Sequence, residues 1–256
     1  MSCVSNPLSV YIPLRVTTQS DLNALAGVPC VEGSLTLSGA DITDLTPLYN
    51  LQNVTGNLEV SETGLTSITD AFPNLDYVGW AVQFYRNHDL VAFDGFHALE
   101  QTGENIDFWY HDSLTSLSGF NALHTVGWSL EIGGNLLLTT IPDYASLQFI
   151  QSSLFILDND SLTHVNGFQA LEHVDWAFQI VDYSETLPPI DLIGFYNYFV
   201  RMPDGVYTGG GDFDIERSGM VTTIQDVIDA GGGDSTTTTT TTTQAATTSK
   251  FWSESF

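Results

Sequence analysis

The chain has 256 residues, of which 43% are hydrophobic, so it is long enough to bury a sizeable core. Its formal net charge is -26, from 31 acidic against 5 basic residues, which excludes nucleic acid as a partner because phosphate would be repelled. No apolar run approaches the roughly 18 residues that span a bilayer, so no transmembrane segment is predicted. The first residues lack the basic and apolar segments of a signal peptide, which implies either a processed chain or secretion that this sequence does not encode.

Residues 1–31 are predicted to form an N-terminal cap. A strand is indicated by alternating apolar residues, Val10, Ile12, Leu14 and Val16, and Thr18 or Ser20 is positioned to cap a short helix that carries Leu22 and Leu25. Cys3 and Cys30, which are the only cysteines, bracket this cap. A disulfide between them would close the N-terminal end of the core and would imply an oxidising compartment, whereas the alternative is two buried free thiols.

Residues 32–200 contain a repeat of 24 residues, with one step of 23. The first apolar residue of each predicted short strand marks the repeat: Leu35, Leu58, Val82, Ile106, Leu130, Leu154 and Phe178. Two residues further on, a second apolar position is kept throughout: Leu37, Val60, Phe84, Phe108, Ile132, Ile156 and Ile180. This alternation predicts one strand per repeat with one buried face.

The rest of each repeat has apolar residues at every third position, as at Leu114, Leu117, Phe120, Leu123 and Val126. That spacing favours short strands and corners around a core over an amphipathic helix. The fold class predicted is therefore mainly β: a solenoid of about seven 24-residue rungs with N- and C-terminal caps, in which each rung depends on its neighbours for stability.

Residues 201–230 are predicted to form a C-terminal cap, with one displaced strand near Ile215 and a short helix that ends at Gly231. Residues 231–256 are predicted to be a Gly/Thr-rich linker and tail. Its threonine run is a candidate O-glycosylated stalk, the alternative being an undecorated spacer: Thr236, Thr237, Thr238, Thr239, Thr240, Thr241, Thr242 and Thr243. Two N-glycosylation sequons begin at Asn53 and Asn159.

The segment GSLTLSGADITDLTPLYNLQNVTGNLEVSETGLTSI, residues 33–68, resembles the receptor L-domain, the leucine-rich-repeat-like module of insulin-receptor and epidermal-growth-factor-receptor ectodomains. It is also similar to the L-domain-like repeats of microbial surface proteins. The resemblance extends over roughly residues 3–181 and implies a right-handed β-helical solenoid with a non-catalytic binding role. No cysteine-rich module or kinase accompanies it here, so a microbial surface protein fits better than a signalling receptor.

The outward positions of the predicted strands form the candidate binding face. Its residues combine aromatic, acidic and aliphatic side chains: Gln83, Tyr85, Asp107, Trp109, Glu131, Phe155, Leu157 and Val181. A face of this composition is typical of an interaction surface, and the resemblance implies ligand docking on the same sheet. The alternative is that the C-terminal segment covers this face.

Two further columns of the repeat have a predicted role. Trp80, Trp128 and Trp176 occupy one position on alternate rungs, where corner packing is favoured over a row of platforms for sugar rings. Asn87, Asn135 and Asn159 share the turn after the strand, where stacked amides are predicted to bond the next turn. The histidines show no metal spacing, and we predict neither a metal site nor a cofactor.

These observations predict a non-catalytic extracellular or cell-surface binding or adhesion module for a protein or glycan ligand, and a second copy of the same chain is among the candidate ligands. One alternative is a structural subunit that assembles into an extracellular filament or surface layer. A second alternative is a β-helical carbohydrate-active enzyme, for which outward acidic residues such as Asp107 and Glu131 would be required.

Overall fold

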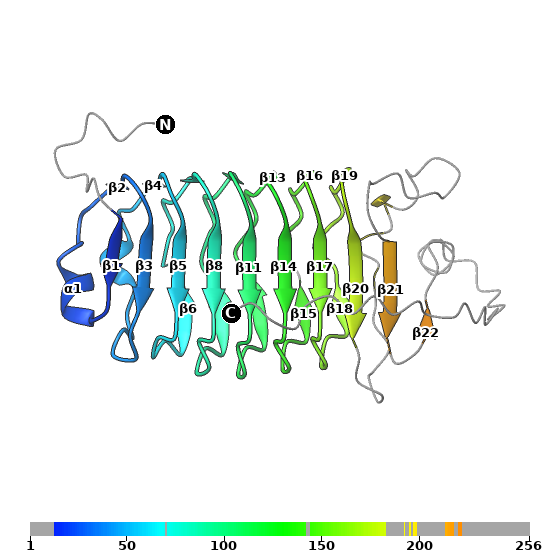
Figure 1. The fold of residues 1–256 in the computed structure, drawn as a ribbon, viewed down its shortest axis with the longest axis horizontal. Coiled ribbons are helices and arrows are strands. Elements are labelled where there is room, and N and C mark those ends of the chain that lie inside the picture. Colours follow the sequence, from blue (N-terminus) through cyan, green and yellow to red (C-terminus); the bar gives the residue numbers. More distant parts are fainter. Residues whose placement is uncertain are drawn as a thin grey trace.

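The computed structural model describes residues 13–69, 71–141, 144–182, 192, 195, 197–198, 213–217 and 220–221. These residues form a β-solenoid of about seven turns, in which parallel strands of successive rungs stack in three sheets (Figure 1). The predicted fold class is confirmed. The predicted C-terminal helix and the threonine run lie outside the described residues.

The largest sheet has ten strands and carries the candidate binding face. In spatial order its strands are β1 (Leu14–Val16), β3 (Leu35–Ser38), β5 (Leu58–Ser61), β8 (Val82–Tyr85), β11 (Ile106–Trp109), β14 (Leu130–Gly133), β17 (Leu154–Leu157), β20 (Phe178–Asp182), β21 (Phe213–Arg217) and β22 (Met220–Val221). All pairs are parallel except β21 with β22. Each of the seven predicted marker residues is the first residue of its strand, the first six pair with the next marker, and Phe178 pairs with Phe213 of β21.

Two smaller sheets complete each rung. The seven-stranded sheet comprises β2 (Cys30–Val31), β4 (Asn53–Val54), β7 (Tyr77–Val78), β10 (Gln101–Thr102), β13 (Thr125–Val126), β16 (Phe149–Ile150) and β19 (His173–Val174). The five-stranded sheet comprises β6 (Ser67–Thr69), β9 (Ala92–Asp94), β12 (Ser116–Ser118), β15 (Thr140–Ile141) and β18 (His164–Val165). Residues at every third position fill the core between these sheets, and the residues from Leu114 to Val126 that follow this spacing are fully buried.

At the N-terminal end, β1 adds a strand in register with β3, pairing Leu14 with Leu35. The helix α1 (Gln19–Asn23) begins after Thr18, whose side chain accepts a hydrogen bond from the backbone of Asp21. Leu22 of this helix is fully buried, so the helix packs on the end of the core, as Figure 1 shows at the blue end of the chain. A single 3-10 turn, η1 (Thr46–Leu48), lies in the first full rung.

An aromatic stack runs through the core along one corner. Its members occupy successive rungs: Phe72, Phe96, Phe120, Tyr144, Phe168 and Phe195. Neighbouring ring centroids are 4.6 to 5.5 Å apart, and all six side chains are fully buried. Aromatic stacking adds to the free energy of area burial, so this column connects the rungs along the solenoid axis.

The turn that follows each long strand has the same construction on five consecutive rungs. The first turn residue has a positive φ: Glu62, Arg86, Tyr110, Gly134 and Asp158. Its backbone N–H donates to a carbonyl of the next strand, as Tyr110 N does to Gly133 O at 3.0 Å. The next residue points inward and bonds the neighbouring turn, which forms the predicted asparagine ladder.

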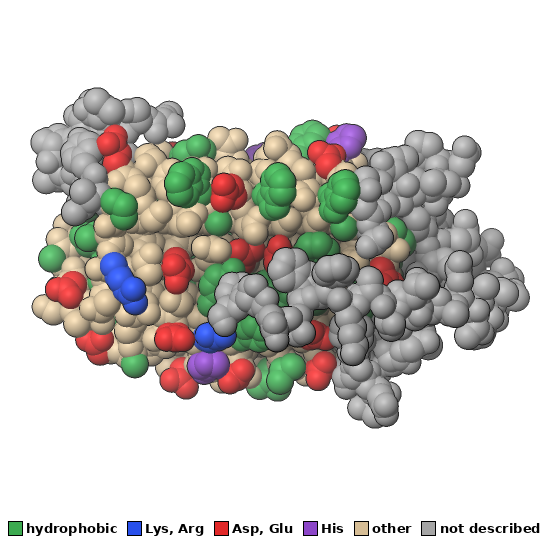
Figure 2. Space-filling model, in the orientation of Figure 1, with side chains coloured by type: hydrophobic (Ala, Val, Ile, Leu, Met, Phe, Trp, Pro, Cys, Tyr) green, Lys and Arg blue, Asp and Glu red, His purple; other side chains and the backbone are tan. Residues whose placement is uncertain are grey.

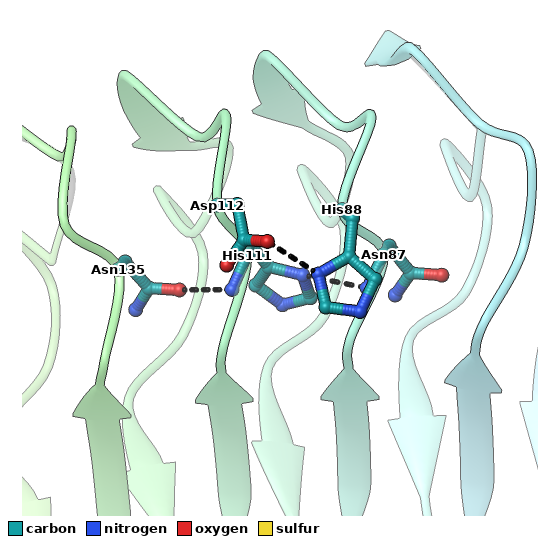
Figure 3. A network of polar contacts seen from close by, with 5 residues as sticks. All are labelled: Asn87, His88, His111, Asp112 and Asn135. Atoms are coloured by element: carbon teal, nitrogen blue, oxygen red, sulfur yellow. Dashed lines mark hydrogen bonds and ion pairs between the residues drawn. The ribbon is translucent and has the colours of Figure 1, made fainter.

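In this ladder Asn87, Asn135 and Asn159 are fully buried, and the Asn159 Oδ1 accepts a hydrogen bond from Asn135 N at 3.2 Å. His111 occupies the rung between Asn87 and Asn135, a position to which the sequence assigned no role. Its backbone N–H donates to Asn135 Oδ1 at 3.1 Å, and its Nδ1 accepts from Asn87 N at 3.2 Å (Figure 3). The imidazole thus replaces an amide within the ladder, and burial lowers its pKa to about 4.

The prediction that the tryptophan column packs into a corner is wrong. Trp80, Trp128 and Trp176 are 54%, 59% and 57% exposed, because their side chains project outward from the corner. The backbone of that corner is tightly stacked instead. A Cβ at Gly79 would lie 2.1 Å from Thr55 O, and one at Gly127 would lie 2.2 Å from Gly103 O, so only glycine fits before two of the tryptophans.

Candidate functional site

The eight residues of the predicted binding face lie at outward register positions of five adjacent strands, β8, β11, β14, β17 and β20, although Val181 is only 3% exposed. Register pairing forms one column from Gln83 through Asp107 and Glu131 to Phe155. A second column runs from Tyr85 through Trp109, Gly133 and Leu157 to Val181. Acidic and hydrophobic side chains lie together over the middle of this sheet (Figure 2). Successive residues within each column are lateral neighbours, since paired strands are about 4.8 Å apart.

Asp107 is the centre of a polar cluster on this face. Its Oδ2 accepts hydrogen bonds from Gln83 Nε2 at 3.1 Å and from the Tyr85 hydroxyl at 3.0 Å. Gln83 Nε2 also lies 3.3 Å from the Tyr85 hydroxyl, so the three side chains form a closed triangle. Asp107 is only 2% exposed, and its Oδ1 is buried without a hydrogen-bond partner among the described residues. Asp107 Oδ1 is thus a buried acceptor without a short hydrogen bond among these residues, although the Asn105 side chain also lies near enough to lower the pKa of Asp107.

Burial shifts the ionisation of both acidic groups toward neutral pH. It raises the pKa of Asp107 to about 6, against the lowering effect of hydrogen bonds from Gln83 and Tyr85. Burial and the neighbouring Asp107 charge raise the pKa of Glu131 to about 7, and a hydrogen bond from Trp109 opposes that rise. The pKa of Tyr85 is also raised, by burial and by Asp107. A basic group placed beside this pair would stabilise both carboxylates in their charged form.

Two aromatic rings lie across the boundary between β11 and β14. A Cβ at Gly133 would lie 2.1 Å from Trp109 Cζ3, and one at Gly134 would lie 2.6 Å from Tyr110 Cδ1. The two glycines therefore provide a flat shelf on which the rings of Trp109 and Tyr110 rest, with ring centroids 5.5 Å apart. Trp109 is half-buried and Tyr110 is 50% exposed, so the shelf presents aromatic surface beside the Asp107 cluster.

Sequence reasoning missed Tyr110 and Gly134 as parts of this surface. The signal was present, because two adjacent glycines occur in register with two adjacent aromatic residues of the preceding rung. When the repeats are aligned, small residues on one rung lie beside large residues on the rung before it. This arrangement gives the bulky side chains room between stacked rungs.

Comparison with known families is consistent with this geometry. Residues 27–109 match the family model described as Receptor L domain. The predicted resemblance is confirmed. The matched segment extends from just before β2 to the last residue of β11, and the rungs that follow continue in the same register. No curated protein and no solved structure is significantly similar to the chain.

Receptor L domain is a family of non-enzymatic binding domains, which indicates a ligand-binding module. Receptor L domains are typically extracellular. Among the described residues no helix is long and apolar enough to cross a membrane. Groups of three or more His, Cys, Asp or Glu side chains that could hold a metal ion do not occur within the described ranges.

The burial of the two asparagines in the solenoid argues against both predicted N-glycosylation sites. Asn53 is 8% exposed within β4, and Asn159 is fully buried in the ladder. The Asn159 amide nitrogen donates to Ile132 O at 2.9 Å, so a glycan on that atom would disrupt the ladder. A sequon is defined by residue types alone, whereas the position of the asparagine in the repeat determines whether its side chain is buried.

The remaining predicted sites lie at or beyond the edge of the described residues. Cys30 is buried in the first rung, whereas Cys3 lies outside the described residues, so their pairing stays a prediction. The same applies to the O-glycosylation candidates from Thr236 to Thr243.

Proposed function

We infer that this protein is a non-catalytic extracellular or cell-surface binding module that engages its ligand through the outward face of the ten-stranded sheet. The receptor L domain match supports a binding role in general. The observation that carries the assignment to this face is the cluster centred on Asp107, where a buried carboxylate lies among Gln83, Tyr85 and the Trp109 shelf. A buried carboxylate oxygen without a short hydrogen bond is costly, and a ligand group that donates to Asp107 Oδ1 would remove that cost.

The chemistry of the cluster defines the ligand group that it fits. Trp109 and Tyr110 offer flat aromatic surface, and Asp107 with Glu131 offers acceptors whose charged form gains from a nearby cation. An ammonium or guanidinium group above these residues would contact both features, because cations are also attracted to aromatic faces. A protein or glycan with a basic group next to an apolar surface therefore fits this site best.

Binding partners can be sought by screening the full chain against protein and glycan arrays. We expect the double variant Trp109→Ala/Phe155→Ser to lose the partners that the wild-type chain retains. The matched control is Tyr49→Ala/Val91→Ala, which removes two exposed side chains elsewhere and leaves the face intact. Retention of every partner by the Trp109→Ala/Phe155→Ser variant would contradict the proposed face.

The non-catalytic part of the proposal has a separate test. A pair of carboxyl groups on adjacent strands, one of them with a raised pKa, is also what a carboxylate-based glycoside hydrolase would require. We expect no turnover on a panel of neutral glycans with the wild-type chain. Reproducible turnover that disappears in Asp107→Asn would assign catalysis to this pair instead.

A further inference from the structure

The three exposed tryptophans form a regular row outside the binding face. Each lies two residues before the start of a long strand, Trp80 before β8, Trp128 before β14 and Trp176 before β20. Figure 2 shows large hydrophobic side chains in a row along the upper part of the face, at the level where these strands begin in Figure 1. Exposed apolar residues are ordinary when scattered, whereas three of the largest at one repeat position are not.

The backbone beneath the row holds the tryptophans at a fixed spacing. Trp80 O accepts a hydrogen bond from Glu104 N at 3.0 Å, and Trp128 O accepts one from Ser152 N at 2.9 Å. Ser152 O in turn accepts from Trp176 N at 2.7 Å. Since each tryptophan is two rungs from the next, neighbouring tryptophans are about 9.6 Å apart along the solenoid axis.

Small or polar residues separate the three rings. Glu104 lies exposed between Trp80 and Trp128, and Ser152, which is 8% exposed, lies between Trp128 and Trp176. The row is therefore a series of separate aromatic platforms rather than a continuous apolar patch. A partner with a continuous apolar surface would leave Glu104 and Ser152 without hydrogen-bond partners. A partner whose flat groups have the same spacing as the tryptophans would contact each ring.

An extended β-1,4-linked glycan has flat rings at this interval. Successive sugars in such a chain are turned over, so every second ring presents the same face, and one disaccharide is close in length to two rungs. The C–H face of a pyranose stacks on an indole ring, much as other flat groups stack on aromatic side chains. Three tryptophans on alternate rungs thus match three alternate sugars of one chain laid along the solenoid axis.

Charge selects among glycans of this geometry. The chain carries a net charge of -26, which repels acidic polysaccharides. Glu104 also places a carboxylate in the gap between two platforms, where an amino group would pair with it. Chitin contains such amino groups wherever it is deacetylated, whereas cellulose has none. We propose that Trp80, Trp128 and Trp176 form a binding strip for chitin.

The test is retention of the full chain on colloidal chitin, with microcrystalline cellulose as the second matrix. Replacing Trp80, Trp128 and Trp176 by alanine should weaken retention on chitin by about tenfold for each ring removed, as the loss of one stacked aromatic contact implies. The control replaces three other exposed side chains, Tyr49, Leu136 and Leu137, by alanine and should bind as the wild type does. Circular dichroism should show the same fold for all variants.

A spacing variant separates the regular interval from mere hydrophobicity. Glu104→Trp combined with Trp128→Glu keeps the composition and the charge but places two rings on adjacent rungs. We expect this variant to lose chitin binding nearly as fully as the triple alanine variant. Wild-type retention by either variant would overturn the strip, and equal retention of the wild-type chain on cellulose would overturn the choice of chitin.

Two further measurements complete the design. Self-association of the wild-type chain that is lost in the triple variant would identify the row as a contact between copies, and would overturn the proposal. The Trp109→Ala/Phe155→Ser variant should still bind chitin, because its substitutions lie on the sheet face. The strip and the proposed face can therefore fail independently.

Discussion

At the scale of single residues, His111 shows how a ladder position sets the properties of a side chain. The imidazole is fully buried, and its Nδ1 must stay unprotonated to accept the hydrogen bond from Asn87 N. On the outer side of these turns, the His88 Nδ1 of the preceding rung lies 2.8 Å from Oδ2 of Asp112, and both side chains are exposed (Figure 3). His88 and His111 thus belong to turns of successive rungs, and His111 is the one that lies inside the ladder.

We predict that His111→Asn makes the protein more stable in acid. The pKa of His111 is about 4 in the folded chain, below its ordinary value of 6.5, so the unfolded chain binds more protons between these values. Wild-type stability from this residue is therefore full above pH 6.5 and is lost as the pH falls toward 4, by roughly 3 kcal/mol at most. Urea unfolding of both chains across this range measures the difference.

The control for this prediction is His173→Asn, which changes an exposed histidine on β19. Its free energy of unfolding should follow the wild-type dependence on pH.

The raised pKa values of Asp107 and Glu131 act in the opposite direction. Their contribution to the free energy of unfolding is full below pH 4 and is lost as the pH rises through 6 to 7. An unchanged profile in His111→Asn would show that the ladder histidine is not held neutral.

The sequence predicted the ladder at its asparagines but not at His111. Stacked asparagines are recognised by residue type, and a histidine is usually read for metal spacing, which is absent here. Only its column position, 24 residues from both Asn87 and Asn135, could have identified it. Likewise the acidity of Asp107 was visible in the sequence, whereas its burial depends on the packing of Gln83, Tyr85 and neighbouring side chains.

At the scale of elements, the shelf of Gly133 and Gly134 at the end of β14 fixes the aromatic surface of β11. We predict that Gly133→Ala displaces the Trp109 ring, because the new Cβ would lie 2.1 Å from Trp109 Cζ3. Stability should change by less than about 1 kcal/mol, since the site is outside the core and alanine suits a strand better than glycine. Binding at the proposed face should be lost.

The measurement is the Trp109 indole N–H resonance, assigned by its absence in Trp109→Phe. Ser61→Ala is the control, because Ser61 occupies the same column on β5, two rungs away. Its Trp109 resonance should match the wild type. An unshifted resonance in Gly133→Ala would mean that the ring does not rest on the shelf.

Strand starts were the most predictable feature at this scale, because period-2 alternation and a constant repeat length act together. The turns were less so: positive φ at Arg86, Tyr110 and Asp158 is unusual for these residue types and has no local signal. It follows from the stacking of turns, each of which hydrogen-bonds the next rung. The outward tryptophans were misassigned for a related reason, since periodicity marks a column but not the side to which its side chains point.

At the scale of the whole molecule, stability depends on contacts between neighbouring rungs, and the core aromatic stack is the clearest of these contacts. We predict that Phe120→Ala lowers the free energy of unfolding by about 3 to 5 kcal/mol, because it leaves a cavity between Phe96 and Tyr144. Tyr49→Ala, at a 55% exposed residue, should change it by no more than about 0.5 kcal/mol. Chemical denaturation followed by circular dichroism compares them.

The same variant reports on cooperativity. Because each rung contacts only its neighbours, a weakened central rung can uncouple the two halves of the solenoid. We expect the Phe120→Ala transition to become broader than that of the wild type or to split in two. A transition that moves to lower denaturant with an unchanged slope would instead show that the rungs unfold as one unit.

The alternation of the tryptophan column also means that the molecule has two different units of length. The core repeats after 24 residues, so loss or duplication of one rung would preserve every buried contact pattern. The outer row repeats after 48, so the same event would bring two tryptophans onto adjacent rungs or separate them by three. Chains of this kind can lengthen by any number of rungs without harm to the fold, but only by pairs of rungs without harm to the spacing of their outer rings.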